Sequence, residues 1–381
     1  MKTNPKSKTN RIRRAVVKVG SNVLTADSGL NVNAIQSISS QICQMLDRGI
    51  QIILVSSGAM ASGMKKMQFS KRPGAIPKRQ AISAIGQADL IREWEKSFER
   101  FGYKVAQILL TSDDLTSRKR YLNARNTLNT LLEWQVVPII NENDTIMVEE
   151  IKLGDNDNLA AMIALLLDAD IFFNLTDIDG LYDKDPREHS DACLIPRVST
   201  YGRNIEKYAG DIPGALGTGG MLSKIKAARK VTASGIPMVI ARGHQADILL
   251  RLADGEELGT YFVPRKQKLN RKKCWIGYTV NTQGVLQVDA GATNALLNNG
   301  KSLLPSGITA VRGNFPVGAA VAVVDENDVS IGNGLVNYNA EDIRAIMGIR
   351  TSRIKDRLGQ KTYDEVIHRD NLVITGERQR A

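Results

Sequence analysis

The stretch Ala15-Val16-Val17-Lys18-Val19-Gly20 predicts a buried strand followed by a sharp turn, because β-branched side chains favour strands and glycine allows the turn. Further apolar runs of strand length follow it at 52–55, 105–110, 136–140, 171–175 and 237–240. Helical patterns lie between several of these runs, as in residues 35–46, 79–100 and 118–134. Strands that alternate with helices indicate an α/β fold with a mainly parallel sheet covered by helices.

Polar residues directly follow several of the predicted strands. They are Ser56-Ser57-Gly58-Ala59, Asn141-Glu142-Asn143-Asp144 and Thr176-Asp177. The carboxyl ends of parallel strands lie at one edge of a sheet, and such folds bind their ligands there. Lys18 interrupts a buried strand, which is costly unless its ammonium group points at an anion. We therefore expect an anionic ligand at this edge of the sheet.

A glycine-rich loop precedes a run of helix-forming residues, and it reads Gly217-Thr218-Gly219-Gly220-Met221-Leu222-Ser223-Lys224. Glycines let the backbone approach a ligand closely, and the N–H groups of a helix N-terminus suit a phosphate. A cation near the first turn opposes the helix dipole, so an anionic ligand explains Lys224 better than helix stability does. The alternative is a surface loop with a solvated lysine, and the loop taken alone slightly favours that alternative.

Four aspartates follow strands or precede a helix near the same edge: Asp144, Asp155, Asp157 and Asp177. Any one of them alone is more often an N-cap or a turn residue. Taken together with Lys18 and the glycine-rich loop, they suit phosphoryl transfer with magnesium. The sequence contains neither a Walker A motif nor a GxGxxG motif after the first strand, which disfavours those two classes of nucleotide-binding protein.

Composition and charge are those of an ordinary soluble protein. The chain has 381 residues, of which 43% are hydrophobic and 24% charged, and its length predicts two domains or one large one. The net charge of +11 is concentrated in residues 1–14 and 264–275, which each hold six basic residues and no acid. Scattered cysteines and histidines disfavour disulfides and a zinc site, and no apolar run reaches the ~20 residues of a membrane span. We expect a cytoplasmic protein.

The pattern of the chain changes near residue 276. Short strand-like runs at 285–288 and 321–324 are separated by closely spaced glycines, which predicts a small, mostly β, barrel-like domain. The charged segment 265–275 would then be a linker between two domains. Residues after about 362 have weak periodicity, and we expect them to form a tail.

The ordered motifs resemble those of the amino acid kinase family, and in particular of its members that phosphorylate glutamate. The resemblance is carried by Val16–Ser21, Val55–Ala59, Asn141–Asp144, Gly154-Asp155-Asn156-Asp157-Asn158, Thr176-Asp177 with Gly180-Leu181-Tyr182, and the glycine-rich loop. The later part resembles a PUA domain, in Leu303–Ile308, Gly313-Asn314-Phe315 and Gly334–Tyr338. The resemblance implies a basic extension over 1–13, a three-layer αβα sandwich over 14–264, a linker over 265–275, a PUA domain over 276–361 and a tail over 362–381. Two features depart from the family pattern: Ser56 stands where threonine is usual, and the extension 1–13 is extra.

The resemblance implies ATP-dependent phosphorylation of the γ-carboxylate of L-glutamate, the first step of proline biosynthesis. That carboxylate, with an ordinary pKa of ~4.3, is already ionised at neutral pH, so no general base is required. The implied catalytic residues are Lys18, Lys224 and Asp157, and those on glutamate are Ser57, Asp144 and Asn156. The implied ATP contacts are Lys18, Thr176, Asp177, Thr218, Gly219, Gly220, Met221, Leu222, Ser223 and Lys224. Magnesium would be carried by the nucleotide phosphates without a protein metal site, and inhibition by proline and a homo-oligomer are implied as well.

Two alternatives stay open. Related kinases of aspartate, N-acetylglutamate, carbamate and UMP are built on the same sheet, although the motifs 141–144 and 154–158 together with a PUA domain favour glutamate. An RNA-binding protein is the alternative from another class, because PUA domains often occur in RNA-modifying enzymes and the chain is basic. Aromatic residues make up only 5% of the chain, which leaves few side chains for stacking on bases and weakens that alternative.

Overall fold

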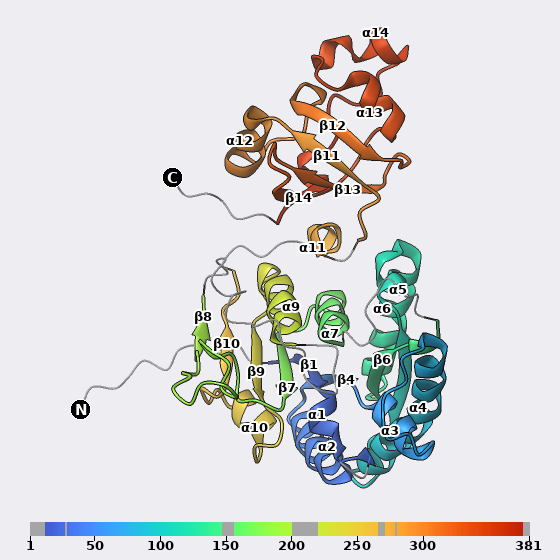
Figure 1. Ribbon diagram of the computed structural model, residues 1–381, viewed down its shortest axis with the longest axis vertical. Helices are drawn as coiled ribbons and strands as arrows, with labels where there is room; N and C mark the ends of the chain where they lie inside the picture. The colour runs from blue at the N-terminus through green and yellow to red at the C-terminus, as the bar shows by residue number, and fades with distance from the viewer. Residues whose placement is uncertain are drawn as a thin grey trace, which may run out of the picture. The chain divides into compact units, whose positions relative to one another are not determined.

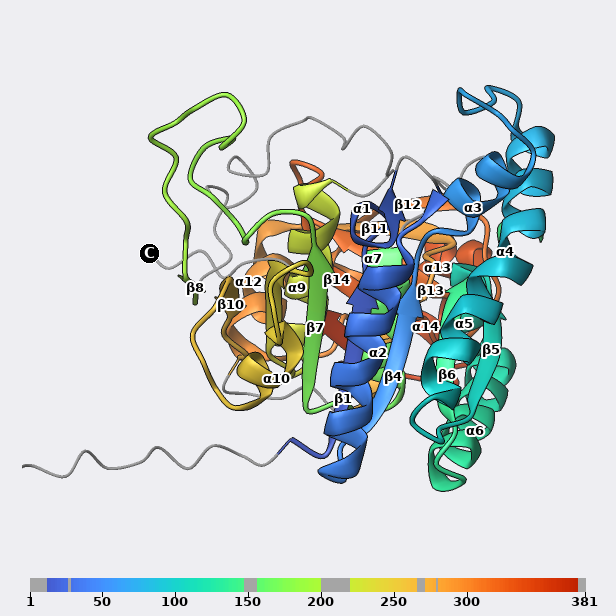
Figure 2. The same ribbon diagram turned by 90° about the horizontal axis from the view of Figure 1, so that it is seen from below.

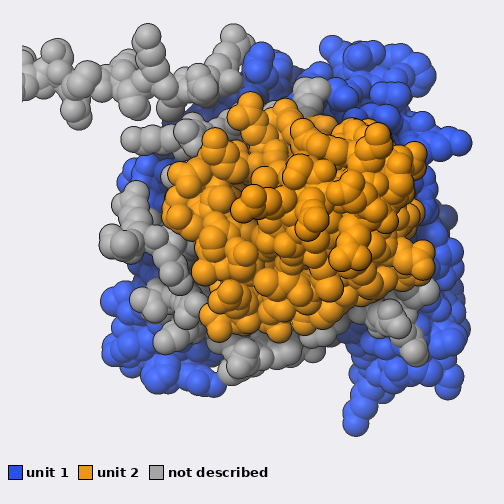
Figure 3. Space-filling view, turned by 90° about the horizontal axis from the view of Figure 1, so that it is seen from above, with its two compact units in different colours: residues 1–268 blue, residues 269–381 orange. Residues whose placement is uncertain are grey.

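The computed structural model describes residues 12–26, 29–146, 156–199, 220–265, 271–278 and 280–375. The chain divides into two compact units, residues 1–268 and 269–381, which are coloured separately in Figure 3. The first unit holds every residue that the sequence assigns to chemistry. Among the described residues, no helix combines the length and the apolar character that crossing a membrane requires.

The first unit is built on an eight-stranded sheet in the order β5-β6-β4-β1-β7-β9-β10-β8. The strands are β1 (Arg14–Val19), β4 (Gln51–Ser56), β5 (Val105–Leu110), β6 (Val137–Glu142), β7 (Ile171–Thr176), β8 (Arg197–Val198), β9 (Met238–Arg242) and β10 (Thr260–Phe262). All neighbours are parallel except β9 and β10. The mainly parallel sheet predicted from the sequence is therefore confirmed.

Helices cover both faces of this sheet, so the unit has three layers (Figure 1). On one face, α2 (Val32–Asp47), α4 (Ile76–Glu99) and α10 (Ile248–Ala253) share a hydrophobic core with the strands. Figure 2 shows α2 and α10 in front of the strands on that face. On the other face, α7 (Asn156–Leu166) packs on β1, β4 and β7, α9 (Met221–Ala233) packs on β9, and α6 (Arg118–Glu133) packs on β6.

The alternation of side chains along β1 points Lys18 at the α7 face. Ala15, Val17 and Val19 belong to the core formed with α2 and α4. Because successive side chains of a strand point to opposite faces, Val16 and Lys18 face α7 and α9 instead. The ammonium group of a buried lysine is thereby brought next to the N-termini of two helices.

Short elements complete the first unit. They are α1 (Ser21–Leu24), β2 (Thr25–Ala26), β3 (Gly29–Leu30), α3 (Ala59–Lys66), α5 (Ser112–Thr116) and the 3-10 turn η1 (Asp144–Ile146). Helices α3 and α4 approach closely at two glycines: a Cβ on Gly63 would lie 1.9 Å from the carbonyl oxygen of Ile82, and one on Gly86 1.9 Å from that of Ala59. This close packing fixes α4 beside the loop that follows β4.

The second unit is rich in β structure, as the sequence predicts. Its sheet has the order β12-β11-β13-β14-β15. The strands are β11 (Gly284–Val288), β12 (Ile308–Gly313), β13 (Ala320–Val324), β14 (Ser330–Leu335) and β15 (Leu372–Ile374), with helices α11 (Arg271–Tyr278), α12 (Ala290–Asn299), α13 (Ala340–Ile346) and α14 (Ile354–Leu358). A separate hydrophobic core holds these elements together.

Two expectations about the borders of this unit are wrong in part. The tail expected over 362–381 includes β15, which pairs antiparallel with β14, and Val366 and Ile367 are buried in the core. The linker expected over 265–275 ends in helix α11, where Cys274 and Ile276 are buried. A short strand needs only a partner edge and a few buried side chains, so weak periodicity in its own sequence does not reveal it.

Candidate active site

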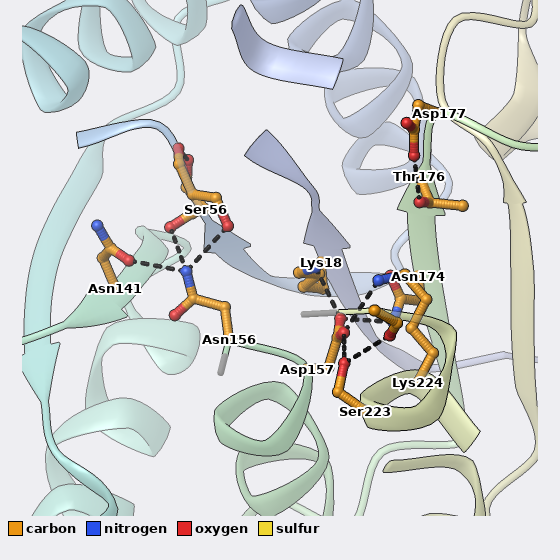
Figure 4. A network of polar contacts seen from close by, with 12 residues as sticks. Lys18, Ser56, Asn141, Asn156, Asp157, Asn174, Thr176, Asp177, Ser223 and Lys224 are labelled. Carbon is orange, nitrogen blue, oxygen red and sulfur yellow. Dashed lines mark hydrogen bonds and ion pairs between the residues drawn. The ribbon is translucent and has the colours of Figure 1, made fainter. Parts of the chain in front are cut away.

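The polar residues expected at one edge of the sheet do lie together there (Figure 4). Strands β1, β4, β6 and β7 all end at this edge because they are parallel neighbours in the sheet. Helix α7 begins at the same edge with Asn156 and Asp157, and α9 begins there with Met221. The site is therefore assembled from strand ends and helix starts that are far apart in the sequence.

A buried ionic cluster centred on Asp157 forms the middle of the site. One carboxylate oxygen of Asp157 lies 2.6 Å from Nζ of Lys18 and accepts a hydrogen bond from Nδ2 of Asn174 at 2.9 Å. The other oxygen lies 3.0 Å from Nζ of Lys224 and accepts a hydrogen bond from Oγ of Ser223 at 2.6 Å. The side chains of Lys18, Asp157 and Lys224 are 6%, 1% and 7% exposed, so water screens their charges little.

The charges in this cluster do not cancel. Burial by itself would raise the pKa of Asp157, but the charges of Lys18 and Lys224, with hydrogen bonds from Lys18 and Ser223, hold that pKa well below its ordinary value. The carboxylate is therefore ionised at neutral pH. Two ammonium groups around one carboxylate give these three groups a net charge of +1, and the charge of Lys224 also acts on Asp177. This local excess suits an anion at the mouth of the cluster.

An amide cluster centred on Asn156 lies beside the ionic cluster. Nδ2 of Asn156 donates to Oγ of Ser57 at 2.9 Å, to Oδ1 of Asn141 at 3.0 Å and to the carbonyl oxygen of Ser56 at 3.3 Å. Nδ2 of Asn141 in turn donates to Oε1 of Gln87 at 2.7 Å. Oδ1 of Asn156 is buried and has no hydrogen-bond partner among the described residues, so it offers an acceptor to a ligand.

Asp144 lies in the turn η1 after β6, next to Ser83 on α4. Its carboxylate accepts a hydrogen bond from Oγ of Ser83 on α4. Burial raises the pKa of Asp144, while the hydrogen bond from Ser83 and the charge of Arg72 oppose that rise. Its carboxylate is thus placed where a cationic group of a ligand would be favoured.

Thr176 and Asp177 lie at the end of β7, on the side of the ionic cluster away from Asn156 (Figure 4). Oγ1 of Thr176 donates to Asp177 at 3.0 Å, and Nδ2 of Asn22 on α1 donates to the other oxygen of Asp177 at 2.8 Å. Burial would raise the pKa of Asp177, but these two hydrogen bonds lower it below its ordinary value.

The glycine-rich loop is described only from Gly220 onward. Gly220 is the N-cap of α9, and its carbonyl oxygen accepts a hydrogen bond from Oγ of Ser223 at 2.9 Å. Met221 and Leu222 form the first turn of that helix with Ser223 and Lys224. Thr218 and Gly219, both predicted ATP contacts, lie outside the described residues.

Three site residues escape the sequence analysis. Asn174 is fully buried on β7 and lies beside Lys18 in the register of the sheet. A polar residue in the otherwise apolar run 171–175 was a signal of the same kind as Lys18 and could have found it. Ser83 and Gln87 give no such signal, because polar residues on a helix are usually solvated.

Comparisons with known proteins agree with this geometry. Residues 13–242 match the amino acid kinase family, and residues 284–358 match the PUA domain. The glutamate 5-kinase of Syntrophus aciditrophicus is 50% identical over 380 residues, which covers 100% of this chain and 99% of the relative. Those of Thermoanaerobacter sp. strain X514 and Geobacter sulfurreducens are 48% and 47% identical, over 95% and 96% of this chain and 97% and 98% of the relatives. The solved UMP kinase of Bacillus anthracis aligns with a TM-score of 0.47 at 13% identity, over 66% of this chain and 96% of that one.

Proposed function

The chain belongs to the amino acid kinase family, and we propose that it transfers a phosphoryl group from ATP to the γ-carboxylate of L-glutamate, in the biosynthesis of proline. Relatives that match it over nearly their whole length at 47–50% identity are named glutamate 5-kinases. The observation that carries the proposal is the buried cluster of Lys18, Asp157 and Lys224 with its excess positive charge.

This cluster suits the charge that develops during phosphoryl transfer. The attacking carboxylate is ionised at neutral pH, so the site needs positioning and charge neutralisation rather than a general base. Lys18 and Lys224 are the two cations that would flank the transferred phosphoryl group. Asp157 would hold both ammonium groups in place through the contacts of 2.6 Å and 3.0 Å. Donors fixed in advance in this way favour the transition state over the bound substrate.

Glutamate fits the amide cluster and Asp144. Its α-ammonium group carries donors, and both the carboxylate of Asp144 and the unpaired Oδ1 of Asn156 are acceptors. Ser57, already bonded to Asn156, would contact the substrate from the loop after β4. The γ-carboxylate would then point from the amide cluster toward the ionic cluster.

ATP would bind on the other side of the ionic cluster. The first turn of α9, from Gly220 through Met221, Leu222 and Ser223, presents N–H groups that suit phosphate oxygens. Thr176 and Asp177 would contact the nucleotide from the end of β7, and contacts from Thr218 and Gly219 stay predictions. The described residues contain no group of three or more His, Cys, Asp or Glu side chains able to hold a metal ion. Magnesium, which neutralises phosphate charge, would arrive with the nucleotide.

Other partners stay proposals. Proline carries the same α-ammonium and α-carboxylate groups as glutamate, so it would compete for the amide cluster and Asp144. We also predict that the protein forms a homo-oligomer and that it is located in the cytoplasm. RNA binding through the PUA domain is the second candidate function, and a salt-sensitive mobility shift with RNA would favour it.

Trapping the acyl phosphate with hydroxylamine tests the proposed function directly. The purified full chain is incubated with ATP, magnesium and either glutamate, aspartate or N-acetylglutamate, and the hydroxamate is measured. Product with glutamate alone is the expected result. Product with aspartate or N-acetylglutamate but none with glutamate would reject the assignment of the substrate.

A further inference from the structure

One face of α4 points toward the end of the site that holds Asp144. Arg79, Ser83 and Gln87 are four residues apart along the helix, so they lie on the same face. Ser83 donates a hydrogen bond to Asp144, and Gln87 accepts one from Asn141. Arg79 therefore lies one turn beyond Ser83, on the face that lines the amino acid end of the site.

Arg79 has a buried N–H group that pairs with none of the described residues. This group is its Nε, which has no hydrogen-bond partner among them. A buried N–H group without an acceptor is unfavourable, so an acceptor from a ligand would be favoured at this position.

A second arginine, Arg72, lies in the segment between α3 and α4 and shares this environment. Although Arg72 is exposed by surface area, its partial burial and the charge of Arg79 lower its pKa, and the charge of Asp144 raises it. The guanidinium group of Arg72 thus lies within electrostatic range of both Arg79 and Asp144. This end of the site therefore holds two cationic side chains, Arg72 and Arg79, together with the carboxylate of Asp144.

Stability of α4 does not explain this placement. The first turn of α4 contains no acidic residue, and Lys78 and Arg79 follow Pro77 at its start. Cations near a helix N-terminus oppose the helix dipole. An anion bound against Arg79 would remove that unfavourable interaction.

We propose that Arg79 and Arg72 bind the α-carboxylate of the amino acid substrate while Asp144 binds its α-ammonium group, an inference that rests on the proposed function. Arginine presents paired donors that match the two oxygens of a carboxylate. The phosphoryl group would belong to the separate cluster around Asp157. Asn141 is bonded both to Gln87 on α4 and to Asn156, the residue before Asp157. Opposite charges at the two sides of one subsite select a free α-amino acid and disfavour substrates that lack either charge.

The test compares glutamate with its α-amide, which keeps the γ-carboxylate and the ammonium group but loses the α-carboxylate charge. Arg79→Met should raise the KM for glutamate roughly 10-fold to 100-fold, the range for a lost hydrogen bond between charged groups. The KM for the α-amide, the KM for ATP and kcat with glutamate should each change less than about threefold. Arg79→Lys should restore part of the glutamate affinity, because it keeps the charge and loses the paired geometry.

Arg72→Met gives an independent reading, because Arg72 is exposed and its loss leaves the core intact. It should also raise the glutamate KM selectively. The exposed neighbours Lys71 and Lys78 supply the controls Lys71→Met and Lys78→Met, which remove one charge each without touching the subsite. Thermal unfolding of every variant identifies any loss of folded protein.

The outcomes separate this inference from the proposed function. An active wild-type enzyme whose glutamate KM is unchanged in both arginine variants would overturn the inference alone. Equal rises in the KM for glutamate and for its α-amide would also overturn it, since they indicate a structural role. Absence of trapped product from glutamate with the wild-type enzyme would reject the proposed function and this inference together.

Discussion

Replacing Lys224 by methionine should abolish most of the turnover and leave the protein stably folded. In the wild type the buried cluster has two ammonium groups and one carboxylate, with a net charge of +1. Lys224→Met reduces this to a neutral pair of Lys18 and Asp157, which stay 2.6 Å apart. Loss of one preorganised contact to the transition state typically lowers kcat about 100-fold to 1,000-fold, or about 2.7–4 kcal/mol.

Replacing Asp157 by asparagine should, unlike Lys224→Met, lower the thermal stability of the protein strongly. It leaves two ammonium groups, each less than a tenth exposed, without a carboxylate between them. Breaking a buried ion pair from one side costs about 3–5 kcal/mol. At about 2–4 °C per kcal/mol for a unit of this size, the Tm of the first unit should fall by roughly 6–20 °C.

The stabilising contribution of Asp157 should depend on pH. The neighbours of Asp157 hold its pKa below the ordinary value in the folded protein. Its stabilising contribution is therefore fully present above about pH 4, the ordinary pKa of aspartate, and is lost as the pH falls toward the lower pKa of the folded state. Asp157→Asn lacks this contribution at every pH. The difference in Tm between wild type and Asp157→Asn should therefore narrow in acid.

Calorimetry of the full chain measures the Tm, and hydroxamate formation under saturating substrates measures kcat. Lys226→Met is the matched control, because Lys226 is exposed on the same helix two residues further along. The reasoning is refuted if Lys224→Met keeps a kcat near that of the wild type. A fall in Tm in Lys224→Met as large as that in Asp157→Asn would refute the charge argument.

Three further predictions test other parts of the site and fold. Burial raises the pKa of Asp144, so its ionised form is a stability cost that is present above the folded pKa and is relieved as the pH falls through it. Asp144→Asn should thus raise the glutamate KM without lowering the Tm, and a large rise in its ATP KM would contradict the assignment. The wild-type glutamate KM should rise as the pH falls toward that raised pKa. A fragment of residues 1–268 should stay active in the hydroxamate assay, because every proposed ligand contact lies within it; a folded but inactive fragment would place part of the site in the second unit. Gly86→Ala should lower the free energy of unfolding by about 1–3 kcal/mol or more, and with it the Tm, because the new Cβ would lie 1.9 Å from the carbonyl oxygen of Ala59. An unchanged Tm in calorimetry would contradict that packing.

The sequence predicts those site residues whose type conflicts with their local pattern. Lys18 lies in a run of valines, and a charge inside a strand of that pattern demands a partner. Asp157 opens an apolar helix, and Lys224 opens another after a glycine-rich loop. Parallel strands end at a common edge, so the sheet predicts that such residues meet even before any contact is known.

The parts that the sequence does not predict depend on contacts between distant elements. Ser83 belongs to the site because α4 packs against the turn η1 after β6 and brings its hydroxyl to Asp144. Nothing in residues 76–99 alone distinguishes that serine from a solvated one. The tail expected after residue 362 fails for a related reason, because strand β15 exists through its pairing with β14 rather than through its own pattern.

Ser56, which stands where the family usually has threonine, shows what that position requires. Its Oγ accepts a hydrogen bond from Nε1 of the fully buried Trp94 at 2.9 Å and donates to the carbonyl oxygen of Ser57 at 3.0 Å. Both bonds use the hydroxyl group, which serine and threonine share, and neither uses a methyl group. Trp94 thereby ties α4 to Ser56, and the next residue, Ser57, is bonded to Asn156. Serine in place of threonine therefore keeps the hydroxyl group that ties Trp94 to the end of β4, since a side chain without a hydroxyl would leave the indole N–H buried and unpaired.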